Sequence, residues 1–370
     1  MKQFIGETNI TNSIIGRVEK SNPESKLYYI YKNKCEYNKD TTYFLYDNSK
    51  DKINKNKNYF KLIGSSLQIK NHDIVLIQTS GNGTLLYENG KDDNTLIVTH
   101  NCNNECIMCS QPPRHEEDNY LSMNLKIVNL IKNQPNYLCI SGGEPTIKWS
   151  DFIKLVELVN IKLPLTNVFI LSNARVFSEY NKAQMLAKLA KDKVKIAVPL
   201  FSDTDDIHDY IAGIEGAFWE TVNGLLNLHR VGISIEIRVI IMKQNVNRLS
   251  NLIYFIYHNF PFIEHIALMG LEITGNAKKN LNDIWIDPKV ATSSIRNAIL
   301  NANRRNMPIS LYNFPLCTIP KYLWKYARKS ISEWKRVFLP NCNECKVKKL
   351  CCGIFNTNIG VLQKNINPIL

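Results

Sequence analysis

The sequence lacks the features that place a protein in or across a membrane. No apolar run approaches the roughly 20 residues that a membrane-spanning helix needs. The N-terminal stretch MKQFIGETNITNS has no apolar centre of the kind that a secretory signal carries. These two absences predict a protein that works in the cytoplasm and has no membrane partner.

The sequence is also unsuited to a disulfide framework, and it has no concentrated stripe of basic residues. Ten cysteines would indicate disulfides in a small secreted chain, but this chain has 370 residues and no signal, so metal-binding thiols are favoured. The formal net charge is +13, yet the lysines are scattered along the chain. We therefore expect a slight preference for an acidic partner, and we do not expect nucleic acid to be the partner.

The order of apolar stretches divides the chain into three regions. Residues 1–90 hold strand-like runs between polar turns, which predicts a small β-rich domain. Residues 91–306 alternate strand and helix patterns, which is typical of a parallel sheet with right-handed crossovers. Residues 307–370 are irregular and cysteine-rich and form an expected C-terminal extension.

The central region predicts an α/β fold. Its alternating units favour a partial, TIM-like (β/α)6 barrel with its active site at the C-terminal ends of the strands, and a flat doubly wound sheet is the alternative. The expected strands cover residues 95–99, 137–141, 168–172, 194–200, 234–242 and 265–270.

Three cysteines stand within eight residues of the stretch HNCNNECIMCSQPP, directly after the first expected strand. A cubane iron–sulfur cluster usually takes four thiolates. Cys102, Cys106 and Cys109 would therefore leave one metal position open, which is typical of a catalytic rather than a structural site. A zinc site and unrelated core cysteines are the alternatives at this point.

Polar residues follow the next two strands at the same edge of the expected barrel. The motif SGGEPT contains Gly142 and Gly143, which allow the backbone to approach a ligand closely, and the carboxylate of Glu144 comes next. An ordinary glycine turn is the alternative. Ser172 and Asn173 end the third strand and suit hydroxyl groups of a ligand.

Two further features lie on or after the fifth and sixth strands. Arg238 would point into the barrel, where a buried arginine needs an anion. A salt bridge to Glu236 or Glu272 is an equally good explanation. Gly270 begins the motif GLEITGNA directly after the sixth strand.

The cysteine spacing and these motifs, in this order, resemble the radical S-adenosylmethionine (SAM) enzymes over about residues 94–300. The resemblance implies a 4Fe-4S cluster on Cys102, Cys106 and Cys109, with SAM chelating the open iron through its amino and carboxylate groups. The remaining implied SAM contacts, on its amino group, ribose, carboxylate and adenine, are Gly142, Gly143, Glu144, Ser172, Asn173, Arg238, Gly270 and Met108. For Met108, simple core filling is the alternative.

A second group of cysteines lies near the C-terminus. Its members are Cys317, Cys342, Cys345, Cys351 and Cys352. The group resembles the twitch or SPASM type of extension in radical SAM peptide maturases, which implies an auxiliary 4Fe-4S cluster on Cys317, Cys342, Cys345 and Cys351. The choice between Cys351 and Cys352 stays open, and the spacing also permits a four-cysteine zinc knuckle. We expect Cys35 and Cys139 to bind no metal.

The stretches VPLFSDTDDIHDYIAGIEGAFWETVNGL and LPNCNEC extend the resemblance to the His-Xaa-Ser system radical SAM maturases (HxsC type), from about residue 73 onward. This implies an enzyme that cleaves SAM reductively to a 5′-deoxyadenosyl radical and abstracts hydrogen from a ribosomally made peptide. Its implied partners are that peptide, a one-electron donor and a second radical SAM maturase.

Three further expectations concern peptide docking, the roles of His208 and Asp209, and the alternative functions. Strand edges in residues 1–90 would pair with an extended peptide. His208 and Asp209 would stabilise a loop rather than transfer a proton. The alternative functions are a radical SAM enzyme acting on a nucleotide or RNA, and a non-enzymatic zinc protein that binds nucleic acid.

Overall fold

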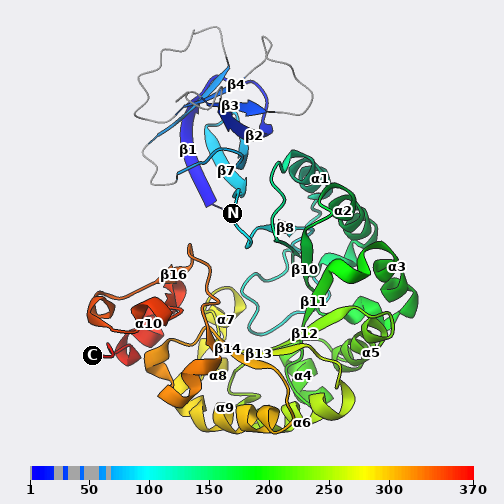
Figure 1. Cartoon of the computed structure of the whole chain (residues 1–370), viewed down its shortest axis with the longest axis vertical. Coiled ribbons are helices and arrows are strands. Elements are labelled where there is room, and N and C mark those ends of the chain that lie inside the picture. The colour runs from blue at the N-terminus through cyan, green and yellow to red at the C-terminus, as the bar shows by residue number, and fades with distance from the viewer. Residues whose placement is uncertain (1, 21–27, 32–41, 46–57, 64–67) are drawn as a thin grey trace. The chain divides into compact units, whose positions relative to one another are not determined.

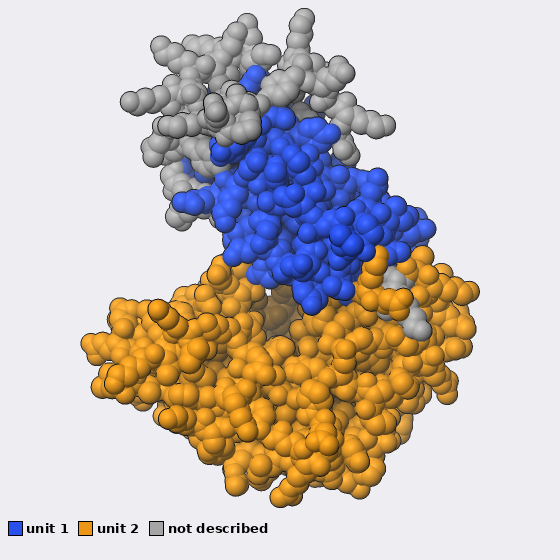
Figure 2. All heavy atoms as spheres, in the orientation of Figure 1, with its two compact units in different colours: residues 1–98, 119–140, 150–168 blue, residues 99–118, 141–149, 169–370 orange. Residues whose placement is uncertain are grey.

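The computed structural model describes residues 2–20, 28–31, 42–45, 58–63 and 68–370. The chain forms two compact units, coloured separately in Figure 2. Unit 1 consists of residues 1–98, 119–140 and 150–168, and unit 2 of residues 99–118, 141–149 and 169–370. These units do not follow the expected division at residues 90 and 306, and that division into three domains stays a prediction.

The N-terminal strands close into a barrel. They are β1 (Lys2–Thr8), β2 (Ile14–Lys20), β3 (Tyr28–Tyr31), β4 (Thr42–Leu45), β5 (Tyr59–Leu62), β6 (Ile74–Ile77) and β7 (Asn82–Tyr87). Their order is β1-β5-β4-β3-β2-β6-β7, and β1 pairs with both β5 and β7. Alternate residues point inward, where Phe44 stacks on Phe60 at 5.7 Å between ring centroids and Phe4 meets both rings edge-on.

The closed barrel corrects one expectation. Because both sides of β1 are paired, closure leaves no free strand edge among the described strands β1–β7. The predicted addition of a peptide strand therefore has no free edge to use among the described strands of this domain, and the docking of a peptide on residues 1–90 stays a prediction. Cys35 lies outside the described residues.

The central sheet confirms the predicted α/β class and the partial-barrel pattern of parallel strands. Its order among the described residues is β15-β14-β13-β12-β11-β10-β9-β8. The strands are β8 (Thr95–Ile97), β9 (Tyr137–Ser141), β10 (Asn167–Leu171), β11 (Val194–Pro199), β12 (Ser234–Ile240), β13 (His265–Met269), β14 (Ile309–Tyr312) and β15 (Ala327–Arg328). Successive pairs from β11 to β15 are parallel.

The sheet is larger than expected, because β14 and β15 follow the six strands that the pattern predicted. Both are short, and they fall in or next to the stretch expected to be irregular. The first part of the predicted C-terminal extension therefore contributes to the sheet itself.

Helices follow the strands along the chain (Figure 1). They are α1 (Leu121–Leu130), α2 (Trp149–Lys162), α3 (Tyr180–Ala190), α4 (Asp205–Ala212), α5 (Ala217–Arg230), α6 (Leu249–Asn259), α7 (Asn276–Lys279), α8 (Leu281–Ile284), α9 (Pro288–Asn303) and α10 (Ile359–Leu362). The short helices α4, α7, α8 and α10 were not expected from periodicity.

Local chemistry explains where the long helices begin and which face they bury. The Asp287 carboxylate accepts the backbone N–H of Lys289, and Pro288 occupies the first turn, so α9 begins there. In α5, Phe218, Leu225 and Leu228 recur at helical spacing and are buried. No helix of the described residues is both long and apolar enough to cross a bilayer.

Candidate active site

The three clustered cysteines lie on the loop that follows β8, within unit 2. Two backbone bonds attach this loop to the end of α4, from Glu105 N to Ala212 O (3.0 Å) and from Ile107 N to Ile211 O (3.0 Å). A third, from Cys109 N to Cys106 O (3.1 Å), turns the loop back on itself.

Burial makes these thiols weak acids when no cation is near. It raises the pKa of Cys102 and of Cys106 to about 12, with smaller increases from the neighbouring cysteines, and it raises the pKa of Cys109. A bound iron would supply the positive charge that thiolates need, and its binding would release protons. Among the described residues, no group of three or more His, Cys, Asp or Glu side chains is placed so that it could hold a metal ion.

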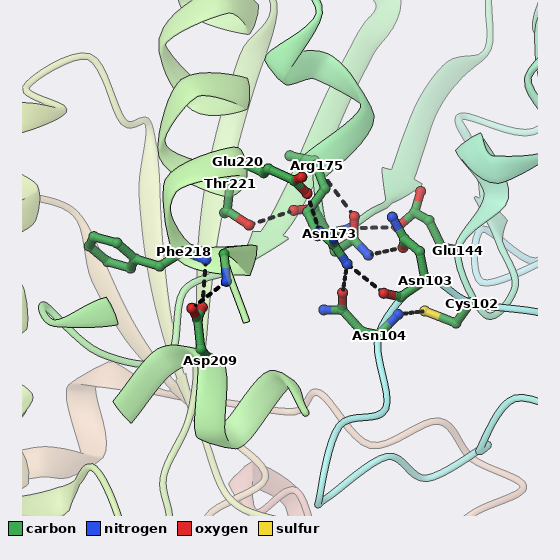
Figure 3. A network of polar contacts seen from close by, with 12 residues as sticks. Cys102, Asn103, Asn104, Glu144, Asn173, Arg175, Asp209, Phe218, Glu220 and Thr221 are labelled. Carbon is green, nitrogen blue, oxygen red and sulfur yellow. Dashed lines mark hydrogen bonds and ion pairs between the residues drawn. The ribbon is translucent and has the colours of Figure 1, made fainter. Parts of the chain in front are cut away.

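Arg175 holds the backbone beside the first cysteine (Figure 3). Its Nη1 donates to Asn103 O and, at 2.6 Å, to Asn104 Oδ1, while its Nε donates to Glu220 Oε2 at 2.5 Å. Asn104 N in turn donates to Cys102 Sγ at 3.4 Å. Arg175 and Asn104 therefore set the position of Cys102. Sequence analysis missed both, although Arg175 follows Asn173 closely at the active-site edge.

Glu144 is fully buried and joins the loops after β9 and β10. Its Oε1 accepts from Thr146 N (3.0 Å), Thr146 Oγ1 (2.5 Å) and Ser172 Oγ (2.9 Å), and its Oε2 accepts from Asn173 N (2.6 Å). Burial raises the pKa of Glu144, and these hydrogen bonds oppose the rise. A carboxylate offers about four acceptor sites. Four protein donors already bind the two oxygens of Glu144. The expected contact of Glu144 with an ammonium group stays a prediction.

The glycines of SGGE pack against the chain that leads to Cys102. Gly143 N donates to Thr99 O and Glu144 N donates to Asn101 O, both at 2.8 Å. A Cβ at Gly142 would lie 2.3 Å from Thr99 O, and one at Gly143 would lie 2.2 Å from Asn101 O. Only glycine permits this approach, which places the two motifs side by side.

Asn173, expected to contact ribose, is part of the same network (Figure 3). Its Nδ2 donates to Asn103 Oδ1 at 2.7 Å, and its carbonyl accepts from Thr221 Oγ1 at 3.1 Å. The structure therefore brings Asn173 and the cysteine loop together, and the ribose contacts of Ser172 and Asn173 stay predictions.

Arg238 forms the salt bridge to Glu236 that was the alternative to an anion in the barrel. Its Nε donates to Glu236 Oε1 at 2.8 Å, and its guanidinium lies 5.2 Å from the centre of the Phe169 ring. Glu272 instead pairs with Lys335 at 2.9 Å. A contact between Arg238 and the SAM carboxylate stays a prediction.

Met108 and the GLEITGNA motif lie against the cysteine loop. Met108 is buried in an apolar cluster that includes Phe201, Ile211 and Leu271. Gly270 N donates to Tyr312 O at 2.9 Å. Gly275 has a φ of +56°, and a Cβ there would lie 2.5 Å from Cys109 O. The roles of Met108 and Gly270 towards adenine stay predictions.

His208 and Asp209 have structural partners, in agreement with the expected loop-stabilising role. The Asp209 carboxylate accepts Gly216 N and Phe218 N, both at 2.7 Å, at the start of α5. The backbone N–H of Phe201 donates to His208 Nδ1 at 3.2 Å. Burial lowers the pKa of His208 to about 4, so its ring is neutral at pH 7.

The C-terminal cysteines meet at one mainly apolar cavity in unit 2. Near it, β16 (Arg336–Val337) and β17 (Ile354–Phe355) form an antiparallel pair. Cys317, Cys342, Cys345 and Cys351 all line the cavity, together with apolar residues such as Leu339 and Ile366. The four thiols expected to share a cluster are therefore gathered in one place, and the cluster itself stays a prediction.

The two adjacent cysteines face different surroundings. Cys352 is buried in a cluster with Ile331 and Phe355 and does not line the cavity. Cys351 Sγ accepts Leu316 N (3.5 Å) and Gly353 N (3.4 Å). A hydrogen bond from the Cys352 thiol is the largest cause that lowers the pKa of Cys351 to about 6, against the effect of burial. This geometry favours Cys351 as the ligand.

Comparisons with known proteins show what the central region is similar to. Residues 96–256 match the family model described as the Radical SAM superfamily. The chain is 27% identical over 164 residues to the sporulation killing factor maturation protein SkfB of Bacillus subtilis (strain 168), covering 43% of this chain and 38% of that protein. It is 25% identical over 205 residues to the Fe-coproporphyrin III synthase of Methanosarcina barkeri (strain Fusaro / DSM 804), covering 54% and 49%. The chain thus spans about half or less of each relative.

Two solved structures match the chain at low sequence identity. Streptococcus suis SuiB bound to the precursor peptide SuiA matches with a TM-score of 0.49 and 16% identity, covering 59% of this chain and 48% of that one. Native anSMEcpe with bound AdoMet matches with a TM-score of 0.46 and 13% identity, covering 59% and 62%.

Proposed function

We propose that this chain, whose residues 96–256 form a radical SAM domain, is a peptide maturase of the His-Xaa-Ser (HxsC) type. It would cleave SAM reductively and abstract hydrogen from a ribosomally made peptide. The observation that carries this proposal is the packing of the three-cysteine loop directly on the SGGE motif, through Gly142 and Gly143.

The residues present fit a 4Fe-4S cluster with one open iron. Cys102, Cys106 and Cys109 are three soft sulfur ligands on one loop, and the fourth position is left to SAM. When bound, the cluster would supply the electron for the reductive cleavage of SAM. The protein positions both groups and excludes water.

The chain's own polar residues have holding roles in this proposal. Arg175 and Asn104 orient the cysteine loop, while Glu144 locks the loops after β9 and β10 against each other. Gly142 and Gly143 let the backbone of Thr99 and Asn101 approach closely, and this holds the chain that leads to Cys102 against the SGGE motif. Arg238 would exchange or share its bond with Glu236 when it binds the SAM carboxylate.

A second 4Fe-4S cluster is proposed on Cys317, Cys342, Cys345 and Cys351, the four thiols that line one cavity. The two curated relatives carry names with different substrates, a killing-factor maturation protein and a porphyrin synthase. The C-terminal cysteine cavity favours the peptide, because a twitch-like auxiliary cluster suits a substrate too long for the barrel alone. The proposed partners are a one-electron donor and a second radical SAM maturase, in the cytoplasm.

The test uses the full chain, reconstituted anaerobically with iron and sulfide. With SAM and a chemical reductant, it should form 5′-deoxyadenosine, and a peptide of His-Xaa-Ser repeats should lose mass equal to the hydrogen removed. Consumption of a nucleotide or RNA in place of the peptide would replace the substrate class. Zinc without iron or sulfide in the purified chain would favour the non-enzymatic zinc protein.

A further inference from the structure

A chain of hydrogen bonds links three adjacent strands of unit 2, away from the cysteine loop. Glu236 Oε2 lies 2.9 Å from His265 Nδ1, and His265 Nε2 lies 3.0 Å from Ser310 Oγ. The three residues come from β12, β13 and β14, which lie next to one another in the sheet (Figure 1). Glu236 and His265 are direct partners in the β12–β13 register.

The chemistry of the three groups sets the direction of these bonds. A carboxylate only accepts, so His265 Nδ1 carries the proton that faces Glu236, and in the neutral ring His265 Nε2 accepts the hydroxyl proton of Ser310. Burial raises the pKa of Glu236, but the hydrogen bond from His265 and the charge and hydrogen bond of Arg238 outweigh it, so this pKa lies below its usual range. Glu236 is therefore an anion that accepts a hydrogen bond from His265.

These side chains line a cavity of about 640 Å³. Glu236, His265, Ser310 and Tyr312 all line this cavity. The ring centre of Tyr312 lies 6.0 Å from that of His265. Other ionisable groups lie around this chain of hydrogen bonds: Arg238 on β12, Lys195 on β11, Tyr312 on β14, Arg328 on β15, and Lys325 and Tyr326.

The charge of this cavity is uneven. Lys195 pairs with Glu264 at 2.5 Å, and Arg238 pairs with Glu236. Lys325 and Arg328 form no ion pair with a carboxylate in the part of the chain that the structure describes. Arg328 Nη1 donates to the backbone carbonyl of Lys325 at 2.9 Å, and both residues line the cavity. Two uncompensated cations at a polar cavity suit an anionic group of a ligand.

A serine–histidine–carboxylate chain also resembles a hydrolase triad, but the setting of Ser310 argues against a nucleophile. Ser310 lies within β14, which pairs with β13 on one side and β15 on the other. Backbone N–H groups in such a strand are used by the sheet, whereas acyl transfer needs N–H donors aimed at an oxyanion. A route for protons fits this position better.

We propose that Glu236, His265 and Ser310 form a proton relay that serves a carboxylic-acid group bound between Lys325 and Arg328 in this cavity. One proton leaves the acid for Ser310 Oγ as the hydroxyl proton of Ser310 moves to His265 Nε2, so the serine keeps one proton and no electron moves. The identification of the acid as part of the peptide substrate rests on the proposed function.

The first experiment uses succinate as the probe and the intact, reconstituted chain. The histidines are labelled with ¹³C at Cε1, and the NMR signal of His265 is assigned by its loss in His265→Gln, where glutamine keeps a donor for Glu236. Succinate should shift this signal saturably. The double variant Lys325→Gln/Arg328→Gln should bind it about five-fold more weakly, as expected when rim charges are removed. The exposed Lys289→Gln on α9 is the matched control and should bind like the unaltered chain.

The second experiment tests the route of the proton. In the unaltered chain, adding succinate below pH 6 should increase the protonated fraction of His265, and Ser310→Ala should abolish this coupling while the signal itself remains. Equal coupling in Ser310→Ala would overturn the relay. Labelling of Ser310 by a fluorophosphonate would overturn it in favour of a nucleophile.

The outcomes separate this inference from the proposed function. A chain that forms 5′-deoxyadenosine from SAM but shows no saturable response at His265 has no such cavity site. A chain that binds succinate as described but cleaves no SAM keeps the site and loses the proposed function.

Discussion

The two cysteine groups of unit 2 are built in opposite ways. Cys102, Cys106 and Cys109 come from one short loop and have polar neighbours, with Arg175 and Asn104 bonded beside them. The C-terminal thiols come from distant stretches, Cys317 on one side and residues 342–351 on the other, and they line a mainly apolar cavity. The first group has three thiols, and four of the five thiols in the second group line its cavity.

In the proposed function, this difference assigns the reaction to the first group and the storage or transfer of electrons to the second group. A loop that supplies three ligands and a polar network leaves one metal position for a reactant and can hold charged groups near it. A closed set of four thiols in an apolar pocket leaves no position for a reactant, and its surroundings tune a potential instead. The proposed roles of the two groups follow from this contrast.

The largest expected effect comes from removing the first group. The triple variant Cys102→Ala/Cys106→Ala/Cys109→Ala should form no 5′-deoxyadenosine above background, because the cluster with an open iron for SAM is lost. It should keep about four irons on the C-terminal thiols, as expected of one cubane. Product chromatography and iron and sulfide analysis measure both. Cys139→Ala, in which the lost cysteine belongs to neither group, is the control, and SAM cleavage by the triple variant would reject the contrast.

The next effect concerns the ligand choice within the second group. Cys351→Ala should lose most of the C-terminal iron, because it removes a thiol that lines the cavity. Cys352→Ala should keep that iron and lower the free energy of unfolding by about 1 kcal/mol, since it only trims a buried side chain. Iron analysis of both variants decides the matter, and the reverse pattern would assign the ligand to Cys352.

A smaller effect should follow from loosening the first loop without removing a thiol. Arg175→Ala leaves Asn103 O and Asn104 Oδ1 without their donor, which costs about 1–3 kcal/mol for buried acceptors. We expect roughly ten-fold slower SAM cleavage and a higher KM for SAM, with the C-terminal iron unchanged. Arg230→Ala, at the end of α5, is the control, because Arg230 bonds only to Asn227 on its own helix among the contacts of the described residues. Equal kinetics in both variants would remove Arg175 from this role.

The smallest effect concerns the stability of α4 at low pH. This helix supports the first cysteine loop and not the C-terminal cysteine cavity. The pKa of His208 is about 4 in the folded chain against an ordinary 6.5, so the unfolded segment binds a proton first as the pH falls. Local stability should therefore be complete above pH 6.5 and decline towards pH 4, by roughly 3 kcal/mol at most. Hydrogen exchange of α4 amides measures this. His208→Gln should flatten the dependence between pH 6.5 and 4, and an unchanged slope would exclude His208 as the cause.

Much of the fold could be predicted from local patterns. The strands from β8 to β13 were expected within two residues of their ends, because buried parallel strands are short apolar runs between helical stretches. The strands β14 and β15 were missed, since four and two residues carry too little pattern to stand out. The N-terminal strands were expected, but closure of their barrel was not, because pairing of β1 with β7 joins residues far apart in the chain.

The sequence by itself led to the chemistry that is proposed for the first cysteine group. Ligand spacing within eight residues, the GGE motif and the alternation of strands and helices are local properties, so each can be read along the chain. Only the tertiary structure decided which distant groups meet. It placed Arg175 beside Asn104, directed Cys351 rather than Cys352 to the cavity, and aligned Glu236, His265 and Ser310 on three strands. Such contacts depend on strand register and on loop packing, and these are set by the whole sheet rather than by neighbouring residues.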